Sequence, residues 1–498
     1  MSSLNEMRHE LSARIVRISG LLIFLVSPLS NAYGQSKRPA EVLALVDQAN
    51  SLPAEFRADT LLRIALSKLI TDAKWKKELI EEAYWSAAHA TLPYAQMAQI
   101  PSDLVAVNSF RANRLDGLSL QSRAIEAMLA IDSKKALGLF EQLPPINLPK
   151  LACSNTVTPN LAEYYQASLD IFESSFTPKQ RANGDDSSFL QRVIGTVEAP
   201  AQVTSALEMI FAAELTAIQR RDLLILLASR LQEISRSDRE YGAAEAGLEL
   251  VLVKIQPTDA TTLLPALRSY IVRHVNANRC TNNIPDKGKL PLSAEQFNSL
   301  AKKFDAEGSR YKPISMEEAE PIRDAGVFLR ESTKESDASK AIAEGLRWLT
   351  HHAEPSSKDW HIRYDETAKH VHDLTEDDEG SVEAFFCAKA DDLNLLTTLL
   401  SPGQLRDRAM DEYREFMEEY YSSIQNPNLW FTMFRHMLYT ARFSEEPETK
   451  DWILNNLTLS SNPVMSLYAK LELRLGPPAQ TYPVLHVTAE QSTVSKRE

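Results

Sequence analysis

The chain has 498 residues, 44% of them hydrophobic, and carries a formal net charge of −13 at pH 7. A chain this acidic lacks the clustered Lys and Arg that neutralise a phosphate backbone, so we exclude nucleic acid as a partner. The same charge disfavours docking on an anionic lipid surface. Only 15 residues are glycine, and this shortage favours helices, because β-rich folds use glycine at hairpins and bulges.

The first 34 residues predict a secretory signal peptide. Arg8, Arg14 and Arg17 precede a short apolar run from Gly20 to Val26, and a small-residue exit ends at Gly34. A retained membrane anchor is the alternative, but a spanning helix needs about 20 apolar residues and this run is shorter. We therefore expect cleavage after Gly34, a periplasmic or secreted mature chain, and no stable membrane insertion.

Apolar residues recur at three- and four-residue steps from residue 35 to residue 150, which predicts two N-terminal helical hairpins. The first joins Ala54–Leu69 to a helix capped by Asp72. The second covers Leu118–Leu143, with Asp132 as the cap at its turn. Short turns of this kind place consecutive helices side by side in antiparallel pairs.

Residues 151–285 predict a central helical array. A proline-rich connector from Pro144 to Thr158 leads into it, and Thr158 is expected to cap the first helix with Pro159 in the first turn. The stretch Pro200–Val275 then reads as four consecutive helices joined by short loops, which must pack as antiparallel neighbours. The last of them is expected to begin at Gln256-Pro257.

The polar segment Asn276–Pro291 is expected to divide two lobes, with a helical C-terminal lobe over 286–475 and a disordered tail over 476–498. Two helices per roughly 35–45 residues is the spacing of helical-repeat solenoids, although no consensus recurs at a fixed period. The predicted fold is therefore all-α, with antiparallel helix pairs stacked as a degenerate α-solenoid in two lobes.

Several segments resemble a group of uncharacterised exported bacterial proteins. The resemblance is carried by Arg114–Asp132 and Pro144–Cys153, and earlier by Ala58–Arg63 and Trp75–Ala83. It covers about the first hundred mature residues. It implies a helical fold and export, and it brings no activity or functional residue with it.

The chain has three cysteines, enough for one disulfide and one free thiol in an oxidising compartment. Three pairings are possible. Cys153 and Cys280 lie in polar, loop-like segments that follow helical stretches, whereas Cys387 lies in a helical pattern that suits a buried thiol. We therefore predict a disulfide between Cys153 and Cys280.

Half of the ten histidines fall in one short stretch. On a helix, His361 would share a face with Asp365, and Glu366 would share one with His370, which are spacings suited to a metal or an acid–base pair. However, no His-Glu-x-x-His signature occurs and no cysteine joins the group. A solvated helix is therefore the favoured interpretation, and we predict no metal and no cofactor. The five histidines are His351, His352, His361, His370 and His372.

The acidic run Thr375–Gly380 invites comparison with a calcium-binding loop. When Gly380 is aligned with the obligatory turn glycine, the twelfth position falls on Phe386, where a bidentate glutamate is required. A charged loop that caps the following helix explains the run better.

Serine nucleophile elbows, phosphate-binding loops, dinucleotide glycine patterns and paired Cys-x-x-Cys motifs are absent from the sequence. The leading hypothesis is therefore a non-catalytic scaffold that binds a protein or peptide partner, and no catalytic residue is predicted. The alternative is an exported enzyme that acts on cell-wall glycan or polysaccharide. In it His361, Arg363 and Tyr364, the residue types that toroidal polysaccharide lyases use, would converge in a pocket of the C-terminal lobe.

Overall fold

The structure, a computed structural model, describes residues 38–91, 94, 96–97, 113–152, 157–236, 238–239, 241, 247–277, 289–305, 310–319, 336–352, 357–400, 403–424, 427–444 and 446–476. Over these residues the fold contains 21 helices and one two-stranded sheet, so the predicted all-α class is confirmed. The predicted signal peptide, Cys153, Cys280 and the tail beyond Gly476 lie outside the described residues. Among the helices described, none is long and apolar enough to cross a membrane.

Thirteen helices precede residue 305: α2 (Ala40–Asn50), α3 (Ala54–Leu66), α4 (Ala73–Ala87), α6 (Gly117–Leu129), α7 (Ser133–Phe140), α8 (Leu161–Ser174), α9 (Pro178–Ala182), α10 (Asp185–Gly195), α11 (Pro200–Ala212), α12 (Ala217–Glu233), α14 (Leu248–Leu252), α15 (Pro257–Val275) and α16 (Leu292–Phe304). Eight follow it: α17 (Asp337–His351), α18 (Lys358–Asp373), α19 (Glu376–Glu379), α20 (Val382–Leu399), α21 (Gln404–Tyr420), α22 (Pro427–Phe443), α23 (Pro447–Thr458) and α24 (Pro463–Leu475).

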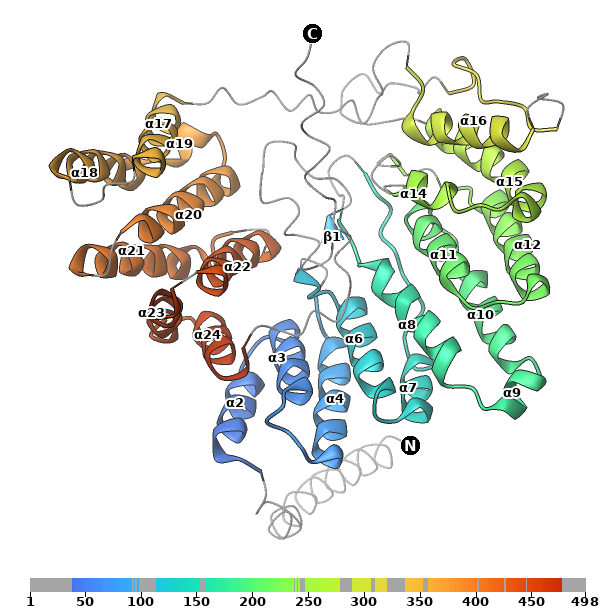
Figure 1. The fold of residues 1–498 in the computed structure, drawn as a ribbon, viewed down its shortest axis with the longest axis horizontal. Coiled ribbons are helices and arrows are strands. Elements are labelled where there is room, and N and C mark those ends of the chain that lie inside the picture. Colours follow the sequence, from blue (N-terminus) through green and yellow to red (C-terminus); the bar gives the residue numbers. More distant parts are fainter. Residues whose placement is uncertain are drawn as a thin grey trace, which may run out of the picture.

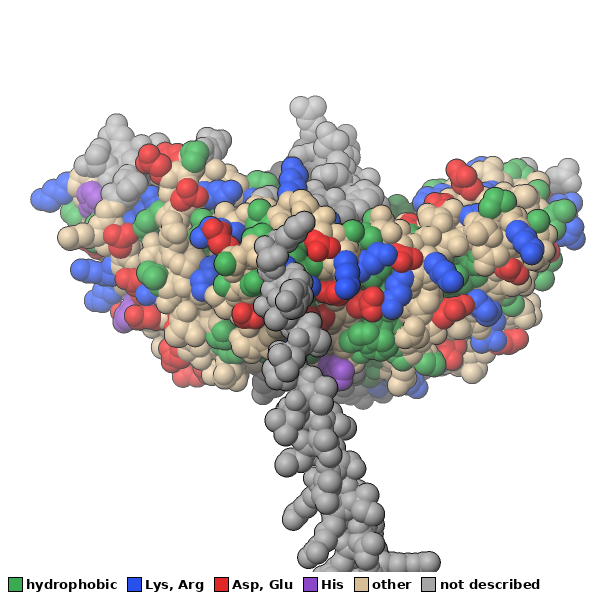
Figure 2. Space-filling view, turned by 90° about the horizontal axis from the view of Figure 1, so that it is seen from below, with side chains coloured by type: hydrophobic (Ala, Val, Ile, Leu, Met, Phe, Trp, Pro, Cys, Tyr) green, Lys and Arg blue, Asp and Glu red, His purple; other side chains and the backbone are tan. Residues whose placement is uncertain are grey.

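The helices are arranged along an open arc (Figure 1). The chain enters near the middle of the arc at α2, runs along one arm to α16, resumes at α17 at the tip of the other arm, and returns to the middle at α24. There α24 packs against α2 and α3, so the first and last described helices are neighbours. Seen from below, acidic and basic side chains are interspersed over the face in view (Figure 2), and the net negative charge is therefore not concentrated there.

An aspartate N-cap begins the second helix of each of the two predicted N-terminal hairpins. The Asp72 carboxylate accepts hydrogen bonds from the backbone N–H groups of Lys74 (2.8 Å) and Trp75 (3.2 Å) and so begins α4. Asp132 accepts from the backbone N–H of Lys135 (3.0 Å) and begins α7. An N-cap of this kind contributes about 1 kcal/mol, which is why these starts could be predicted from the sequence.

The expected start of α8 was wrong. Thr158 does not cap a helix; it belongs to the short strand β2 (Val157–Thr158), which pairs antiparallel with β1 (Gln96–Met97). The helix begins two residues later, where Asn160 accepts a hydrogen bond from the backbone N–H of Ala162 (3.2 Å). The backbone pairing of Thr158 with Gln96, which lies far away in the sequence, overrides the local preference of threonine for a cap.

The expected start of the last helix in the stretch Pro200–Val275 is confirmed. α11, α12, α14 and α15 fall within the stretch Pro200–Val275, and α15 begins at Pro257 with Gln256 as its N-cap. α16, which follows the segment expected to divide the chain, packs against α14 and α15.

The two halves of the chain meet at a contact that we call the seam, in which α22 and α24 pack against α2, α3 and the residues that lead into α6. Its apolar part is aromatic: the Phe56 ring lies 5.2 Å from that of Phe431 and 6.0 Å from that of Tyr468. These three side chains are at most 3% exposed. Because they come from opposite ends of the sequence, their burial ties the two halves of the arc together.

Candidate functional site

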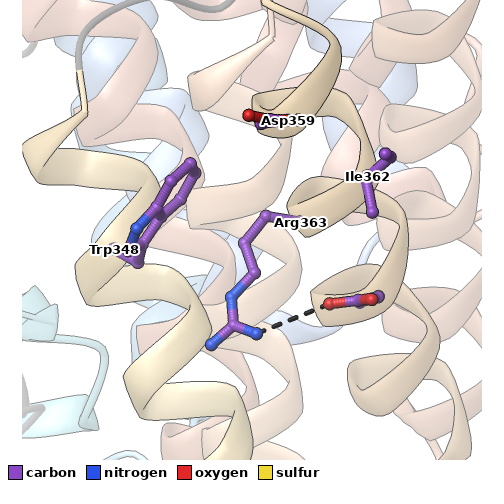
Figure 3. A pocket seen from close by; sticks show the side chains of 5 residues that line it. Trp348, Asp359, Ile362 and Arg363 are labelled. Atoms are coloured by element: carbon purple, nitrogen blue, oxygen red, sulfur yellow. Dashed lines mark hydrogen bonds and ion pairs between the residues drawn. The ribbon is translucent and has the colours of Figure 1, made fainter.

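A hollow of about 340 Å³ lies between α17 and α18, at the tip of one arm. Trp348 of α17 and Asp359, Ile362 and Arg363 of α18 line it, and Figure 3 shows the Arg363 side chain extending between the two helices, with Trp348 on one side of it and Ile362 on the other. The remaining lining residue is Glu366, whose Oε2 accepts a hydrogen bond from Arg363 Nη1 at 3.4 Å.

The close approach of α17 and α18 fixes this hollow. Gly345 faces Thr367 so closely that a Cβ at position 345 would lie only 2.3 Å from Thr367 Oγ1. Trp360 and Tyr364 do not line the hollow; they are at most 5% exposed and stack at 5.4 Å, and Trp360 Nε1 donates to the Leu349 carbonyl oxygen of α17 at 3.4 Å. Burial raises the pKa of the Tyr364 hydroxyl. Gly345 therefore allows α17 and α18 to approach closely, and the buried Trp360–Tyr364 ring pair packs there.

The lining of the hollow combines apolar and charged side chains. Ile362 is 47% exposed and Trp348 is only partly buried, so an apolar surface with an aromatic ring is open to solvent. Arg363 and Glu366 form an ion pair at its edge, with Asp359 nearby. Aromatic and aliphatic anchors surrounded by charged groups are the composition of sites that take peptide side chains.

The three residues proposed for an enzymatic site do not converge. Arg363 lines the hollow, whereas His361 and Tyr364 do not. His361 is exposed and touches only the edge of the Trp360 ring, at 5.6 Å between centroids, and Tyr364 is buried. The three residues were selected by residue type alone, and the helix directs their side chains to different sides.

All five clustered histidines are exposed, as expected for a solvated helix face. His352 stacks on Trp348 at 4.2 Å, and His372 Nδ1 lies 3.1 Å from Glu412 Oε1. Within the described ranges no group of three or more His, Cys, Asp or Glu side chains is arranged to hold a metal ion. The sequence singled out two pairs, His361 with Asp365 and Glu366 with His370. Neither pair forms a hydrogen bond between its two members, all of which lie on the described helix α18.

The acidic run Thr375–Gly380 forms a short helix of its own, α19, rather than the expected loop. Asp378 accepts hydrogen bonds from the backbone N–H (3.0 Å) and the hydroxyl (2.6 Å) of Thr375, which lowers the pKa of its carboxyl. Gly380 ends the turn with φ at 74°, a left-handed conformation that favours glycine. The following helix, α20, is capped by Ser381 instead.

Cys387 on α20 is 3% exposed and unpaired, in agreement with the sequence-based expectation. Burial raises the pKa of its thiol, with Asp391 and Glu383 adding to the effect. A thiol in this environment stays protonated and unreactive.

A second hollow, of about 320 Å³, lies where α7, α8 and α10 meet. Phe140, Tyr164 and Phe189 line it, and the first two rings stack at 5.3 Å. Glu141 and Arg192, at 3.7 Å from each other, are the charged lining residues. It repeats the combination of aromatic surface and ion pair seen at α17 and α18, on the other arm of the arc.

The sequence-based predictions did not include the polar network within the seam. Asp59 receives hydrogen bonds from the Tyr468 hydroxyl (2.6 Å) and forms an ion pair with Arg123 (2.7 Å). Burial opposes ionisation of Asp59, but these partners together hold the pKa of its carboxyl below the ordinary value. Glu472 accepts from Arg63 and Arg442, both at 2.9 Å from Oε1.

Two further arginine contacts complete this network. Arg435 Nη1 donates to Asn113 Oδ1 at 2.7 Å, and its other terminal nitrogen donates to the Tyr439 hydroxyl. We call Arg63, Arg123, Arg435 and Arg442 the arginine cluster. A signal for it exists along α22, where Asn428, Thr432, Arg435, Tyr439 and Arg442 recur at steps of four and three residues and form one polar stripe.

The chain was compared with family models, curated proteins and solved structures, and none of them matches it.

Proposed function

We propose that this protein is an exported helical-repeat scaffold that binds a protein or peptide partner and performs no catalysis. In this proposal the arc is a degenerate α-solenoid of stacked helix pairs in two lobes, one on each side of the seam. Stacked helix pairs create extended surfaces that bind partners, which is the physical reason for the assignment.

The observation that carries the proposal is the hollow between α17 and α18. Trp348 and Ile362 offer a solvent-open apolar surface, and Arg363 and Glu366 lie beside it. Peptide recognition relies on a few aromatic and aliphatic anchors seated among charged groups. The hollow beside Phe140 and Tyr164 on the other arm also combines aromatic rings, which are at most 8% exposed, with an ion pair, so an extended partner would find a second anchor point there.

Export is part of the proposal and rests on the leader sequence that ends at Gly34. N-terminal sequencing of the protein purified from its source cells should begin at Gln35. An N-terminus at Met1, with the chain retained in the cytoplasm, would reject export.

The partner-binding role is tested by affinity capture from the envelope fraction of the source cells. Trp348→Ala removes the ring that faces α18 and should reduce capture of the same partner at least tenfold, the effect expected for an aromatic anchor. Trp85→Ala is the matched control, because Trp85 is 49% exposed on α4 and lines neither hollow.

Equal capture by the wild-type chain and both variants would reject the hollow as the binding site. Failure of the wild-type chain to enrich any partner over a bead control would reject the scaffold role itself.

A further inference from the structure

The arginine cluster has more positive charge than its surroundings balance. Among the described residues its four guanidinium groups form ion pairs with two carboxylates, those of Asp59 and Glu472, so the positive charges of the cluster outnumber the carboxylates paired with them by two. Both carboxylates are at most 7% exposed. In a chain whose overall charge is −13, this local excess is unexpected.

Arg435 accounts for part of the excess. It forms no ion pair with any residue that the structure describes, and its hydrogen bonds go to two neutral groups, the Asn113 amide oxygen and the Tyr439 hydroxyl. Burial lowers the pKa of its guanidinium, Tyr439 and the negative charge of Asp59 oppose that shift, and the group remains protonated. A partly buried cation that forms no ion pair with a carboxylate is costly unless an anion joins it.

The cluster also has more hydrogen-bond donors than acceptors. Arg63 and Arg442 share a single oxygen, Glu472 Oε1, and the Nε atoms of both are buried without an acceptor among the described residues. Buried guanidinium donors normally find acceptors. The shared acceptor and the positive charge that no carboxylate pairs with therefore indicate the same kind of group, an anion with several oxygen atoms.

The cluster is held in place yet reachable. One aromatic ring, that of Tyr439, lies 5.1 Å from the guanidinium carbons of both Arg435 and Arg442, so it orients two of the four cations. Arg123 and Arg442 keep 18% of their side chains exposed, and Arg435 is also only partly buried. An anion can therefore approach without unfolding the seam.

We propose that the arginine cluster binds carboxylate groups of an acidic peptide. Carboxylate is the favoured anion because the same guanidinium groups already hold Asp59 and Glu472 at 2.7–2.9 Å. An excess of two charges matches two carboxylates of one peptide. This inference rests on the proposed peptide-binding function and assigns a substrate class to it.

The test measures binding of two probes, each labelled at the N-terminus with an uncharged BODIPY dye, to the purified full chain by fluorescence anisotropy. Octaglutamate with an amidated C-terminus carries only side-chain carboxylates, whereas octaglutamine with a free C-terminus carries only the terminal one. We expect octaglutamate to bind, and Arg435→Gln and Arg442→Gln each to weaken binding about tenfold or more, as loss of a charge-assisted hydrogen bond requires. Arg435→Lys keeps the charge and should retain part of the affinity.

Arg221→Gln is the matched control, since Arg221 is exposed on α12 outside the cluster, and it should leave the affinity unchanged. Circular dichroism spectra identical to that of the wild-type chain establish that each variant is folded. Binding of octaglutamine alone, with the same dependence on Arg435, would support a carboxylate site that takes a peptide C-terminus.

Equal octaglutamate affinity for the wild-type chain and both glutamine variants would overturn the proposal. So would binding of inorganic sulfate, with the same dependence on Arg435, when neither peptide binds. Trp348→Ala separates this inference from the scaffold role. If Trp348→Ala captures the partner as the wild-type chain does while Arg435→Gln loses octaglutamate binding, the hollow is rejected as the partner site and the arginine cluster is supported as the carboxylate site. If Arg435→Gln keeps octaglutamate binding and Trp348→Ala loses the partner, the arginine cluster is rejected and the hollow is supported.

Discussion

Gly345 controls how closely α17 and α18 can pack, and Gly345→Ala should therefore loosen the hollow between them. A Cβ at this position would lie 2.3 Å from Thr367 Oγ1 and 3.0 Å from Thr367 Cγ2. Thr367 is 1% exposed and donates its hydroxyl to the Arg363 carbonyl oxygen at 2.7 Å, so it has no free space to move into. The helices must move apart or this hydrogen bond must break.

The expected magnitude follows from two opposing terms. Overpacking of a buried contact costs about 1–3 kcal/mol, while replacing a helical glycine by alanine gains about 0.5–1 kcal/mol. The midpoints of these two ranges give a net destabilisation of about 1.3 kcal/mol for Gly345→Ala. Gly138→Ala on α7 is the matched control, because a Cβ there would meet nothing within 4 Å and only the helical gain remains.

Hydrogen–deuterium exchange of the α17–α18 peptides measures the local opening free energy directly. Gly345→Ala should speed exchange there by roughly tenfold, which corresponds to about 1.4 kcal/mol, and Gly138→Ala should slow exchange in α7. Adding Thr367→Ala removes both of the closest atoms and should restore part of the protection. Protection of α17–α18 that is unchanged or increased in Gly345→Ala would refute this account of the helix contact.

Three other predictions concern the interior. Tyr468→Phe removes the hydroxyl that donates to Asp59 and should lower the free energy of unfolding in urea by about 1–3 kcal/mol. The loss should exceed that of Tyr84→Phe, because the Tyr84 hydroxyl donates to a neutral carbonyl oxygen. An equal or smaller loss for Tyr468→Phe would contradict the buried network. Burial raises the pKa of Glu126 to about 9, so between its unfolded pKa of about 4.3 and pH 9 the folded chain holds a proton that the unfolded chain releases. The free energy of unfolding should therefore fall as pH rises through that window, by up to about 1.4 kcal/mol per pH unit, and Glu126→Gln should remove this slope; a slope equal to that of the wild-type chain would refute the assignment. The thiol of Cys387 should resist maleimide in the native chain and react in urea, as measured by peptide mapping, and rapid native labelling would contradict its burial.

Local chemistry made much of the fold predictable. The caps at Asp72 and Asp132 and the prolines that start α11 and α15 act within one helical turn, so the sequence pattern contains the information. Thr158 fails this test because a strand partner more than sixty residues away decides its conformation.

The candidate sites were less predictable, because side chains from distant segments form them. Tyr468 meets Asp59 across 409 residues, and no periodicity encodes that contact. The hollow depends on Gly345 opposite Thr367, a pairing that only the helix crossing creates. The histidine-rich helix was correctly located, but its exposed histidines lie beside the hollow rather than in it, whereas Trp348 and Ile362 went unnoticed.

Site-specific photocrosslinking tests the scaffold role most directly. Benzoylphenylalanine in place of Ile362, which is 47% exposed in the hollow, should form a covalent adduct with the partner in the envelope fraction. The same probe in place of Leu459, which is 72% exposed at the end of α23, should not. Adducts at position 362 alone are the predicted result; adducts at both positions or at neither would contradict a partner seated between α17 and α18.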